Sequence, residues 1–242
     1  MSPVPEAAPA PAGPRRRTLA WSVHVLTASG AAVGLAALLE TARGHPRLAL
    51  LWMLVALAID SVDGTLARRA QVERMVPRID GRRLDDIVDY LNYVIVPVFF
   101  LAWGGRIEPL ALAAAPVLAS AYGFSQTEAK TEDGYFLGFP SYWNVVALYA
   151  WLLELSAPVT TGWLVALSIG VFVPLKYLYP SQMRAWGRVM NAGAGVWILL
   201  VAALLLWPEL PGYAAWAWLT LAYPVGYVVL SFWLGGLSRR RS

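Results

Sequence analysis

Long apolar runs recur along the whole sequence and decide what this chain can fold into. A run of about 20 apolar residues is long enough to cross the hydrocarbon core of a bilayer as one helix. Because lipid offers the backbone no hydrogen-bond partners, such runs must be helical. Turn-forming groups such as Gly44-His45-Pro46 and Gly104-Gly105 separate them. We therefore predict an all-α integral membrane protein with about eight transmembrane helices, at residues 19–40, 47–67, 84–103, 109–127, 141–155, 160–176, 188–207 and 213–235.

The composition agrees with this class and restricts the chemistry. Hydrophobic residues make up 58% of the 242 residues and charged residues 14%, whereas an ordinary soluble domain carries about 25% charged residues. The sequence contains no cysteine, which excludes disulfides, thiolate metal sites and cysteine nucleophiles. Any metal site must therefore use oxygen or histidine ligands.

The basic residues are divided unevenly between the two sides of the predicted membrane. Of the 19 Lys and Arg residues, all except Arg43, Arg47 and Arg106 fall on one side when the spans alternate. Because positively charged loops stay in the cytoplasm, we expect both termini to be cytoplasmic. Basic residues held at a membrane surface suit anionic lipid headgroups, so we expect membrane lipids and no nucleic acid as partners.

The chain begins with a segment that differs from the rest. Its first 14 residues, "MSPVPEAAPAPAGP", are rich in Pro and Ala and cannot bury a core. We interpret residues 1–14 as a disordered tail. We find no internal repeat of fixed period, and we therefore expect residues 15–242 to form one membrane domain.

Four aspartates stand at the ends of two of the most apolar runs, where charge is costly. Residues three or four apart share a helix face, and two such stripes result: Asp60, Asp63, Gly64, Ala67 and Arg68 on one helix, and Gly81, Asp85 and Asp89 on the next. If the stripes face each other, the carboxylates repel strongly unless they are protonated or bind hard cations. Oxygen ligands alone favour Mg²⁺, Mn²⁺ or Ca²⁺ over zinc. The alternative, solvated carboxylates paired with neighbouring arginines, weakens with each further aspartate in register.

The spacing Asp60-x2-Asp63-Gly64-x2-Ala67-Arg68-x12-Gly81-x3-Asp85-x3-Asp89 resembles the signature of the CDP-alcohol phosphotransferase family. Most members have eight residues between the arginine and the second glycine. The twelve found here, "RAQVERMVPRID", resemble a bacterial branch of that family that uses choline. Three further stretches are similar to that branch, and the resemblance covers nearly all of the chain after the tail: "AWSVHVLTASG", "KTEDGYFLGFPSYWNVVA" and "FVPLKYLYP".

The resemblance implies the CDP-alcohol phosphotransferase fold and a reaction. In that reaction the phosphatidyl group of CDP-diacylglycerol passes to the hydroxyl of choline, and CMP is released. The resemblance implies that two Mn²⁺ or Mg²⁺ ions are held by Asp60, Asp63, Asp85 and Asp89, of which Asp89 also takes the choline proton as general base. It assigns binding of the CDP group to Asp63, Gly64, Ala67, Arg68 and Gly81. A homodimer in the bacterial inner membrane is compatible with it.

Choline carries a quaternary ammonium, which is recognised by aromatic faces, often with a carboxylate nearby. The segment "TEDGYFLGFPSYWN", residues 131–144, supplies both kinds of side chain, and two tyrosines follow the second acidic stripe. An interfacial aromatic belt is the alternative explanation for these residues. We predict choline contacts from Tyr90, Tyr93, Glu132, Asp133, Tyr135, Phe136 and Trp143.

Other functions remain open at this point. A different acceptor, such as inositol, serine or glycerol phosphate, would keep the same fold. So would a reversed donor, CDP-choline with diacylglycerol, which the signature does not separate from the first reaction. A divalent-cation transporter is a different class of protein. Its carboxylates are expected near the bilayer midplane, whereas these aspartates stand at the ends of their spans.

Overall fold

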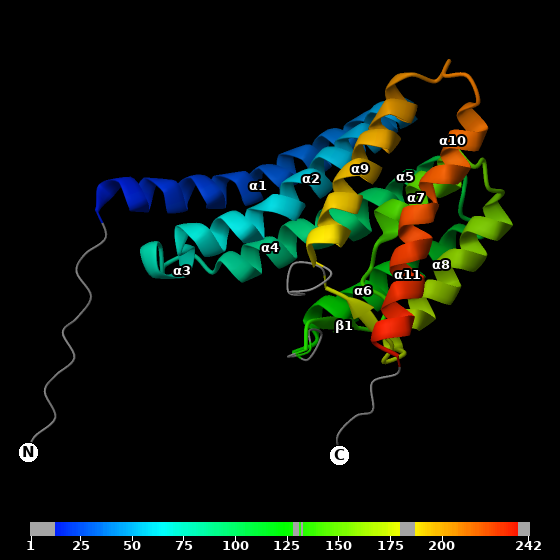
Figure 1. Cartoon of the computed structure of the whole chain (residues 1–242). Helices are drawn as coiled ribbons and strands as arrows, with labels where there is room; N and C mark the ends of the chain where they lie inside the picture. Colours follow the sequence, from blue (N-terminus) through cyan, green and yellow to red (C-terminus); the bar gives the residue numbers. More distant parts are fainter. Residues whose placement is uncertain (1–12, 128–130, 132, 180–186, 237–242) are drawn as a thin grey trace, which may run out of the picture.

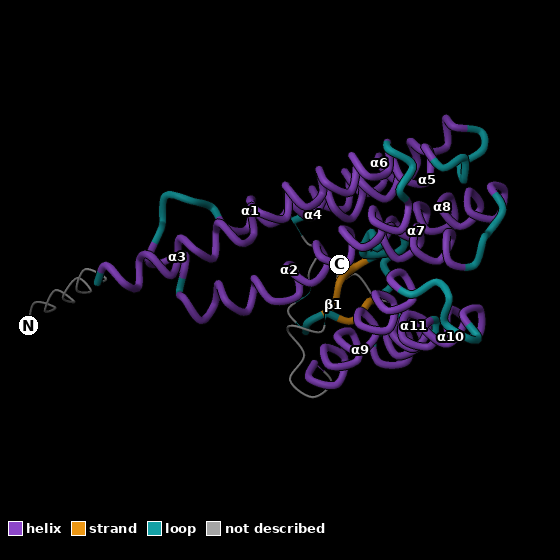
Figure 2. Tube along the Cα trace, turned by 90° about the horizontal axis from the view of Figure 1, so that it is seen from above, coloured by secondary structure: helices purple, strands orange, loops and turns teal. Residues whose placement is uncertain are grey.

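The computed structural model describes residues 13–127, 131, 133–179 and 187–236. In this part the chain forms a helical bundle with one short antiparallel pair of strands (Figures 1 and 2). The elements follow in the order α1 (Pro14–Ala42), α2 (Pro46–Ala70), α3 (Val72–Met75), α4 (Gly81–Asp89), the π-helical turn η1 (Tyr90–Ile95), α5 (Val96–Trp103), the 3₁₀ turn η2 (Leu110–Ala113), α6 (Ala114–Ser125), β1 (Tyr135–Leu137), α7 (Trp143–Leu152), α8 (Ala157–Phe172), β2 (Lys176–Leu178), α9 (Gly187–Leu206), α10 (Tyr213–Thr220) and α11 (Ala222–Leu234).

Each of the eight predicted spans coincides with an apolar helical segment. Among the described residues, five segments are long and apolar enough to cross a membrane: Pro14–Ala42, Pro46–Ala70, Gly81–Trp103, Gly187–Leu206 and Tyr213–Leu234. Three shorter apolar segments occupy the other predicted spans: Leu110–Ser125, Trp143–Leu152 and Ala157–Phe172. Large apolar side chains lie on the outside, such as Leu199 at 71% exposure and Trp233 at 75%, as expected for a surface that faces lipid. The prediction of an all-α integral membrane protein is confirmed.

The strand pair is the main feature that the sequence analysis did not predict. β1 and β2 pair antiparallel, with Tyr135 opposite Leu178. The span predicted to reach residue 176 ends earlier as a helix, because α8 stops at Phe172. Gly138, just after β1, has a φ angle of +82°, and an added Cβ there would lie 2.2 Å from the carbonyl oxygen of Val171. Only glycine fits this position, which holds the strand pair against the end of α8.

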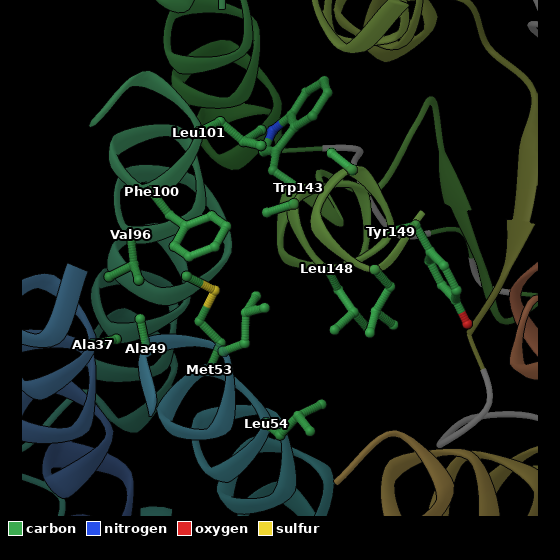
Figure 3. Close-up of a cluster of buried hydrophobic side chains, with 14 of the residues drawn as sticks. Ala37, Ala49, Met53, Leu54, Val96, Phe100, Leu101, Trp143, Leu148 and Tyr149 are labelled. Carbon is green, nitrogen blue, oxygen red and sulfur yellow. The ribbon is translucent and has the colours of Figure 1, made fainter. Parts of the chain in front are cut away.

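The main hydrophobic core lies where α2, α5 and α7 meet. Figure 3 shows side chains from these three helices converging, among them Met53, Phe100 and Leu148. Trp143 at the start of α7 is fully buried in the same core. Its indole N–H donates a hydrogen bond to the hydroxyl of Ser120 at 2.7 Å, so that the buried polar group is satisfied.

Helices α1 and α2 lie side by side, and α1 also packs on α4 and η1 (Figures 1 and 2). Close approach explains two glycines of α1: an added Cβ would lie 2.7 Å from Val88 at Gly30, and 2.6 Å from Asn92 at Gly34. The side-chain amide of Asn92 donates to the carbonyl oxygens of Gly30 and Val88, both at 3.0 Å. Packing of α1 against both α2 and α4 brings the two acidic stripes to one place.

Candidate active site

Asp60 on α2 and Asp85 and Asp89 on α4 bring their carboxylates together, and we call these three residues the acidic cluster. One carboxylate oxygen from each lies within 4.8 Å of the others, and all three residues are half-buried. Asp85 and Asp89 are four residues apart and so share one face of α4. Carboxylates this close repel one another when partly desolvated, and a hard divalent cation bound by their oxygens removes the repulsion. The donor set therefore fits Mg²⁺ or Mn²⁺.

Asp63, the fourth predicted metal ligand, is not a member of the acidic cluster. Its side chain is 4% exposed, and its Oδ2 atom accepts a hydrogen bond from the hydroxyl of Thr27 on α1 at 2.8 Å. The structure thus groups three of the four aspartates and directs the fourth toward α1. Thr27 was not predicted as a site residue. The available signal was its position three residues after His24, which places two polar side chains on one face of an apolar helix.

Tyr93 contacts the acidic cluster directly. Its hydroxyl donates a hydrogen bond to Oδ2 of Asp60 at 2.5 Å, and the residue is 6% exposed. Its ring lies 6.0 Å from the ring of Tyr142, centre to centre. The hydrogen bond restricts the rotation of the Asp60 carboxylate and couples η1 to α2. Such a contact around a metal ligand orients the ligand.

The predicted CDP-binding residues on α2 lie on its last turns. Gly64 and Arg68 are exposed, and in the described part of the chain an added Cβ at Gly64 would meet only Nη1 of Arg68, at 3.6 Å. Arg68 donates a hydrogen bond to the hydroxyl of Thr65 at 3.1 Å. Ala67 is half-buried and packs against a small apolar cluster that includes Val72. The surface beside Gly64 is therefore open and has a cation next to it.

Gly81, the CDP-binding residue predicted on α4, is the first residue of that helix and lies against His24 of α1. An added Cβ at Gly81 would be 3.1 Å from Cε1 of His24. His24 is 6% exposed, and its Nε2 atom has no hydrogen-bond partner among the described residues. An unpaired buried ring nitrogen is unfavourable. A hydrogen-bonding group of a substrate that reached this nitrogen would therefore be stabilised.

The predicted choline residues lie in different surroundings. The hydroxyl of Tyr90 donates to the backbone carbonyl of Val117 on α6 at 3.0 Å. Trp143 has no exposed surface, as described above, and Tyr93 is bonded to Asp60. Glu132 lies outside the described residues. Among the described ones, Tyr90, Tyr93 and Trp143 therefore contact different parts of the bundle.

Asp133 and Tyr135, in contrast, already surround one ammonium group. The Nζ atom of Lys176 is 2.6 Å from Oδ2 of Asp133 and 5.2 Å from the centre of the Tyr135 ring. The hydrogen bond from Lys176 lowers the pKa of the Asp133 carboxyl. Phe136, which follows Tyr135 on β1, packs on the ring of Tyr179 with centres 4.4 Å apart. A carboxylate beside an aromatic face is the environment that a quaternary ammonium requires.

The apolar helical bundle and the acidic cluster together define an integral membrane protein with a CDP-alcohol phosphotransferase signature. No family model matches the chain. Known proteins are similar to it over most of its length. A phosphatidylcholine synthase of Legionella pneumophila is 39% identical over 225 residues, which cover 88% of this chain and 88% of that protein.

Two further relatives are also similar to this chain over most of its length. A phosphatidylcholine synthase of Pseudomonas aeruginosa is 37% identical over 199 residues, covering 80% of this chain and 82% of the relative. One from Agrobacterium fabrum is 32% identical over 224 residues, covering 90% of each chain. This chain therefore belongs to the phosphatidylcholine synthase family.

Proposed function

We propose that this protein transfers the phosphatidyl group of CDP-diacylglycerol to choline, forming phosphatidylcholine and releasing CMP. The observation that carries the proposal is the acidic cluster, found in a chain that is similar over most of its length to proteins named phosphatidylcholine synthase. The cluster supplies the carboxylates that this chemistry needs. The similarity supports choline as the acceptor over inositol, serine and glycerol phosphate.

The acidic cluster would hold a Mn²⁺ or Mg²⁺ ion, and Asp63 would complete a site for a second ion. When bound, such ions neutralise pyrophosphate charge and orient the attacking and leaving oxygens. Oxygen-only ligands support this choice of metal. The hydrogen bond from Thr27 would hold the Asp63 carboxylate in place from the α1 side.

The chain's own residues would position the substrates and move one proton. The choline hydroxyl oxygen attacks the phosphorus that carries the diacylglycerol, and the bond from this phosphorus to the CMP oxygen breaks. Asp89 accepts the proton of the choline hydroxyl as the new bond forms. The open backbone at Gly64 lets the nucleotide approach α2, and the exposed guanidinium of Arg68 pairs with a phosphate.

Choline would be recognised by Asp133 and Tyr135, the pair that surrounds the Lys176 ammonium. Choline would displace this internal cation from the pair. Tyr135 packs, together with Tyr142, against the apolar cluster around Tyr227. Since Tyr142 also contacts Tyr93 beside Asp60, the choline pair and the acidic cluster would be linked through these tyrosines.

We also propose that both termini face the cytoplasm of a bacterium and that the protein lies in its inner membrane. The uneven distribution of Lys and Arg supports this orientation. The absence of cysteine from the sequence makes a test direct, because single cysteines can be introduced without background. Labelling of a terminal cysteine by an impermeant maleimide in intact spheroplasts would contradict the proposed orientation.

The proposed reaction is tested with purified protein in detergent. CDP-diacylglycerol and Mn²⁺ or Mg²⁺ are supplied, with choline, inositol, serine or glycerol phosphate as the only acceptor. CMP release and the lipid product are measured, and a sample with EDTA serves as control. We expect metal-dependent CMP release with choline alone, together with phosphatidylcholine as the product.

The other outcomes each contradict a different part of the proposal. Release with another acceptor would retain the metal site and reject the choline pair. Phosphatidylcholine formed from CDP-choline and diacylglycerol, with no reaction from CDP-diacylglycerol, would establish the reversed donor. No release with either donor, combined with uptake of Mn²⁺ into proteoliposomes, would identify a transporter.

A further inference from the structure

An apolar groove lies on the outer surface between α9 and α11. Figure 1 shows these two helices side by side and running in opposite directions. The groove has a volume of about 370 Å³, within the range of about 300–1,000 Å³ that is typical of small-molecule sites. Its walls include Val189 and Met190 of α9 and Gly226, Val229 and Trp233 of α11. We call it the α9–α11 groove.

The polar atoms that border the α9–α11 groove are already bonded to backbone. The hydroxyl of Tyr223 donates to the carbonyl oxygen of Met190 at 3.1 Å. The hydroxyl of Tyr227 donates to the carbonyl oxygen of Leu178 at 2.9 Å. Both tyrosines line the groove and therefore present ring carbons to it. Such a surface is suited to a hydrocarbon ligand, and its lining residues offer no charged group to a nucleotide.

Three tyrosines with ring-to-ring contacts connect this groove to the acidic cluster. The ring of Tyr227 lies 5.9 Å from that of Tyr142, and the ring of Tyr142 lies 6.0 Å from that of Tyr93, centre to centre. The hydroxyl of Tyr93 is bonded to Asp60. A ligand in the groove would therefore contact Tyr227, the first of three tyrosines whose contacts lead to Asp60.

The groove residues of the two helices lie near the start of α9 and along α11. Arg188, in the first turn of α9, is exposed and precedes Val189, which lines the groove. Trp233, near the C-terminal end of α11, also lines the groove.

We propose that the α9–α11 groove holds one acyl chain of the CDP-diacylglycerol donor. This inference rests on the proposed function, since it assigns the hydrocarbon part of that substrate. The apolar walls support a hydrocarbon ligand, and the contacts of three tyrosines between the groove and Asp60 support the lipid donor of the proposed reaction as its source. Because membrane lipid is as apolar as the groove, binding there depends on close packing of the chain.

The experiment compares two Gly→Leu variants, one at a residue that lines the groove and one at a residue outside it. Gly226 lines the groove, and an added Cβ there would meet no described atom within 4 Å, so Gly226→Leu fills the groove without a clash with protein. Gly195 on α9 is exposed, does not line the groove, and is equally unobstructed. Gly195→Leu is therefore the matched control for adding a leucine to a lipid-facing helix.

The first readout is photolabelling of the full chain by CDP-diacylglycerol with a diazirine on one acyl chain, located by mass spectrometry of peptides. We expect labelled residues on α9 and α11 in the unmodified chain and in Gly195→Leu, and strongly reduced labelling in Gly226→Leu. The second readout is the KM for long-chain donor, which we expect Gly226→Leu to raise about threefold or more through lost packing. The KM for a dihexanoyl donor, too short to need the groove, stays unchanged.

Several results would overturn the inference. Label found on other helices, or equal labelling by a diazirine phosphatidylethanolamine, would show that the groove is not a donor site. Unchanged labelling in Gly226→Leu would do the same. The proposed function fails separately: an unmodified chain that is labelled in the groove but releases no CMP with choline would retain the groove and reject the acceptor.

Discussion

The acidic cluster and the choline segment, residues 131–144, show how differently two parts of the proposed site are specified by the sequence. The acidic cluster stands on regular helices, where residues four apart share a face and neighbouring helices are held by close contacts at Gly30 and Gly34. The choline segment contains a three-residue strand and connecting chain. Its side chains lie in different surroundings, from the fully buried Trp143 to the exposed Asp133.

The difference separates residues whose positions are fixed by helix geometry from residues that were predicted from their chemical type alone. Three aspartates converge because helix geometry fixes their directions. In the choline segment, residue types alone suggested a cage, and only Asp133 and Tyr135 share a cation in the described part of the chain. Substitutions in the acidic cluster should therefore have much larger effects on turnover than substitutions in the choline segment.

The largest expected effect is that of Asp89→Asn. Removal of a general base lowers turnover by roughly 10²–10⁴-fold, and we expect kcat for CMP release to fall by that amount. Asp86→Asn is the matched control, because Asp86 lies on the same helix and is half-buried but is not a member of the acidic cluster. Equal loss of activity in both variants would indicate a general effect of charge on α4.

A second prediction concerns Tyr93→Phe, which keeps the ring and removes the hydrogen bond to Asp60. Residues that orient metal ligands typically change metal affinity or activity by about 10–100-fold, and we expect Mn²⁺ affinity to weaken by about tenfold. Tyr90→Phe is the control, because it loses a hydrogen bond to the backbone of Val117 instead. An increase in the KM for choline with unchanged Mn²⁺ binding would assign Tyr93 to choline recognition.

Two substitutions at the Asp133–Lys176 pair should change the KM for choline in opposite directions. Asp133→Asn removes the carboxylate that would attract the quaternary ammonium, and the KM for choline should rise by roughly two- to tenfold. Lys176→Met removes the internal cation that competes for the same pair, and the KM for choline should fall. The KM for CDP-diacylglycerol is the internal reference. If both variants change the KM for choline in the same direction, the pair does not bind choline.

The smallest expected effect is the pH dependence of the Asp133–Lys176 ion pair. Because the folded chain lowers the pKa of Asp133, the pair stabilises the fold above the unfolded pKa, about 3.9. This contribution disappears as the pH falls through the lowered folded pKa. The pair is exposed, so Asp133→Asn should lower stability at pH 7 by at most about 1 kcal/mol. Thermal unfolding in detergent should show that the difference between the chains vanishes well below pH 4.

Much of the fold could be predicted from the sequence because each bilayer crossing requires a long apolar helix. Each predicted span coincides with an apolar helical segment, and the i, i+4 spacing predicted that Asp85 and Asp89 act together. The strand pair was missed because its two strands have three residues each and pair across about 40 positions of sequence. Strands this short have too few residues to show an alternating pattern.

The details of the site depend on contacts that no local pattern encodes. Asp63 shares a helix face with Asp60. Its carboxylate nevertheless accepts a hydrogen bond from Thr27 of α1 and is not part of the acidic cluster. Tyr93 was predicted from its aromatic character, whereas its hydroxyl contacts Asp60 across 33 residues of sequence. Both outcomes depend on how three helices pack together, and helix spacing alone does not determine this packing.

The acidic cluster is proposed to bind the divalent cation on which turnover depends. Titration of the purified chain with Mn²⁺, followed by the electron paramagnetic resonance signal of the free ion, tests it most directly. We predict saturable binding to the unmodified chain and to Asp86→Asn, and affinity at least about tenfold weaker in Asp85→Asn. Equal binding by Asp85→Asn and the unmodified chain, or no binding by the unmodified chain at millimolar Mn²⁺, would contradict the claim.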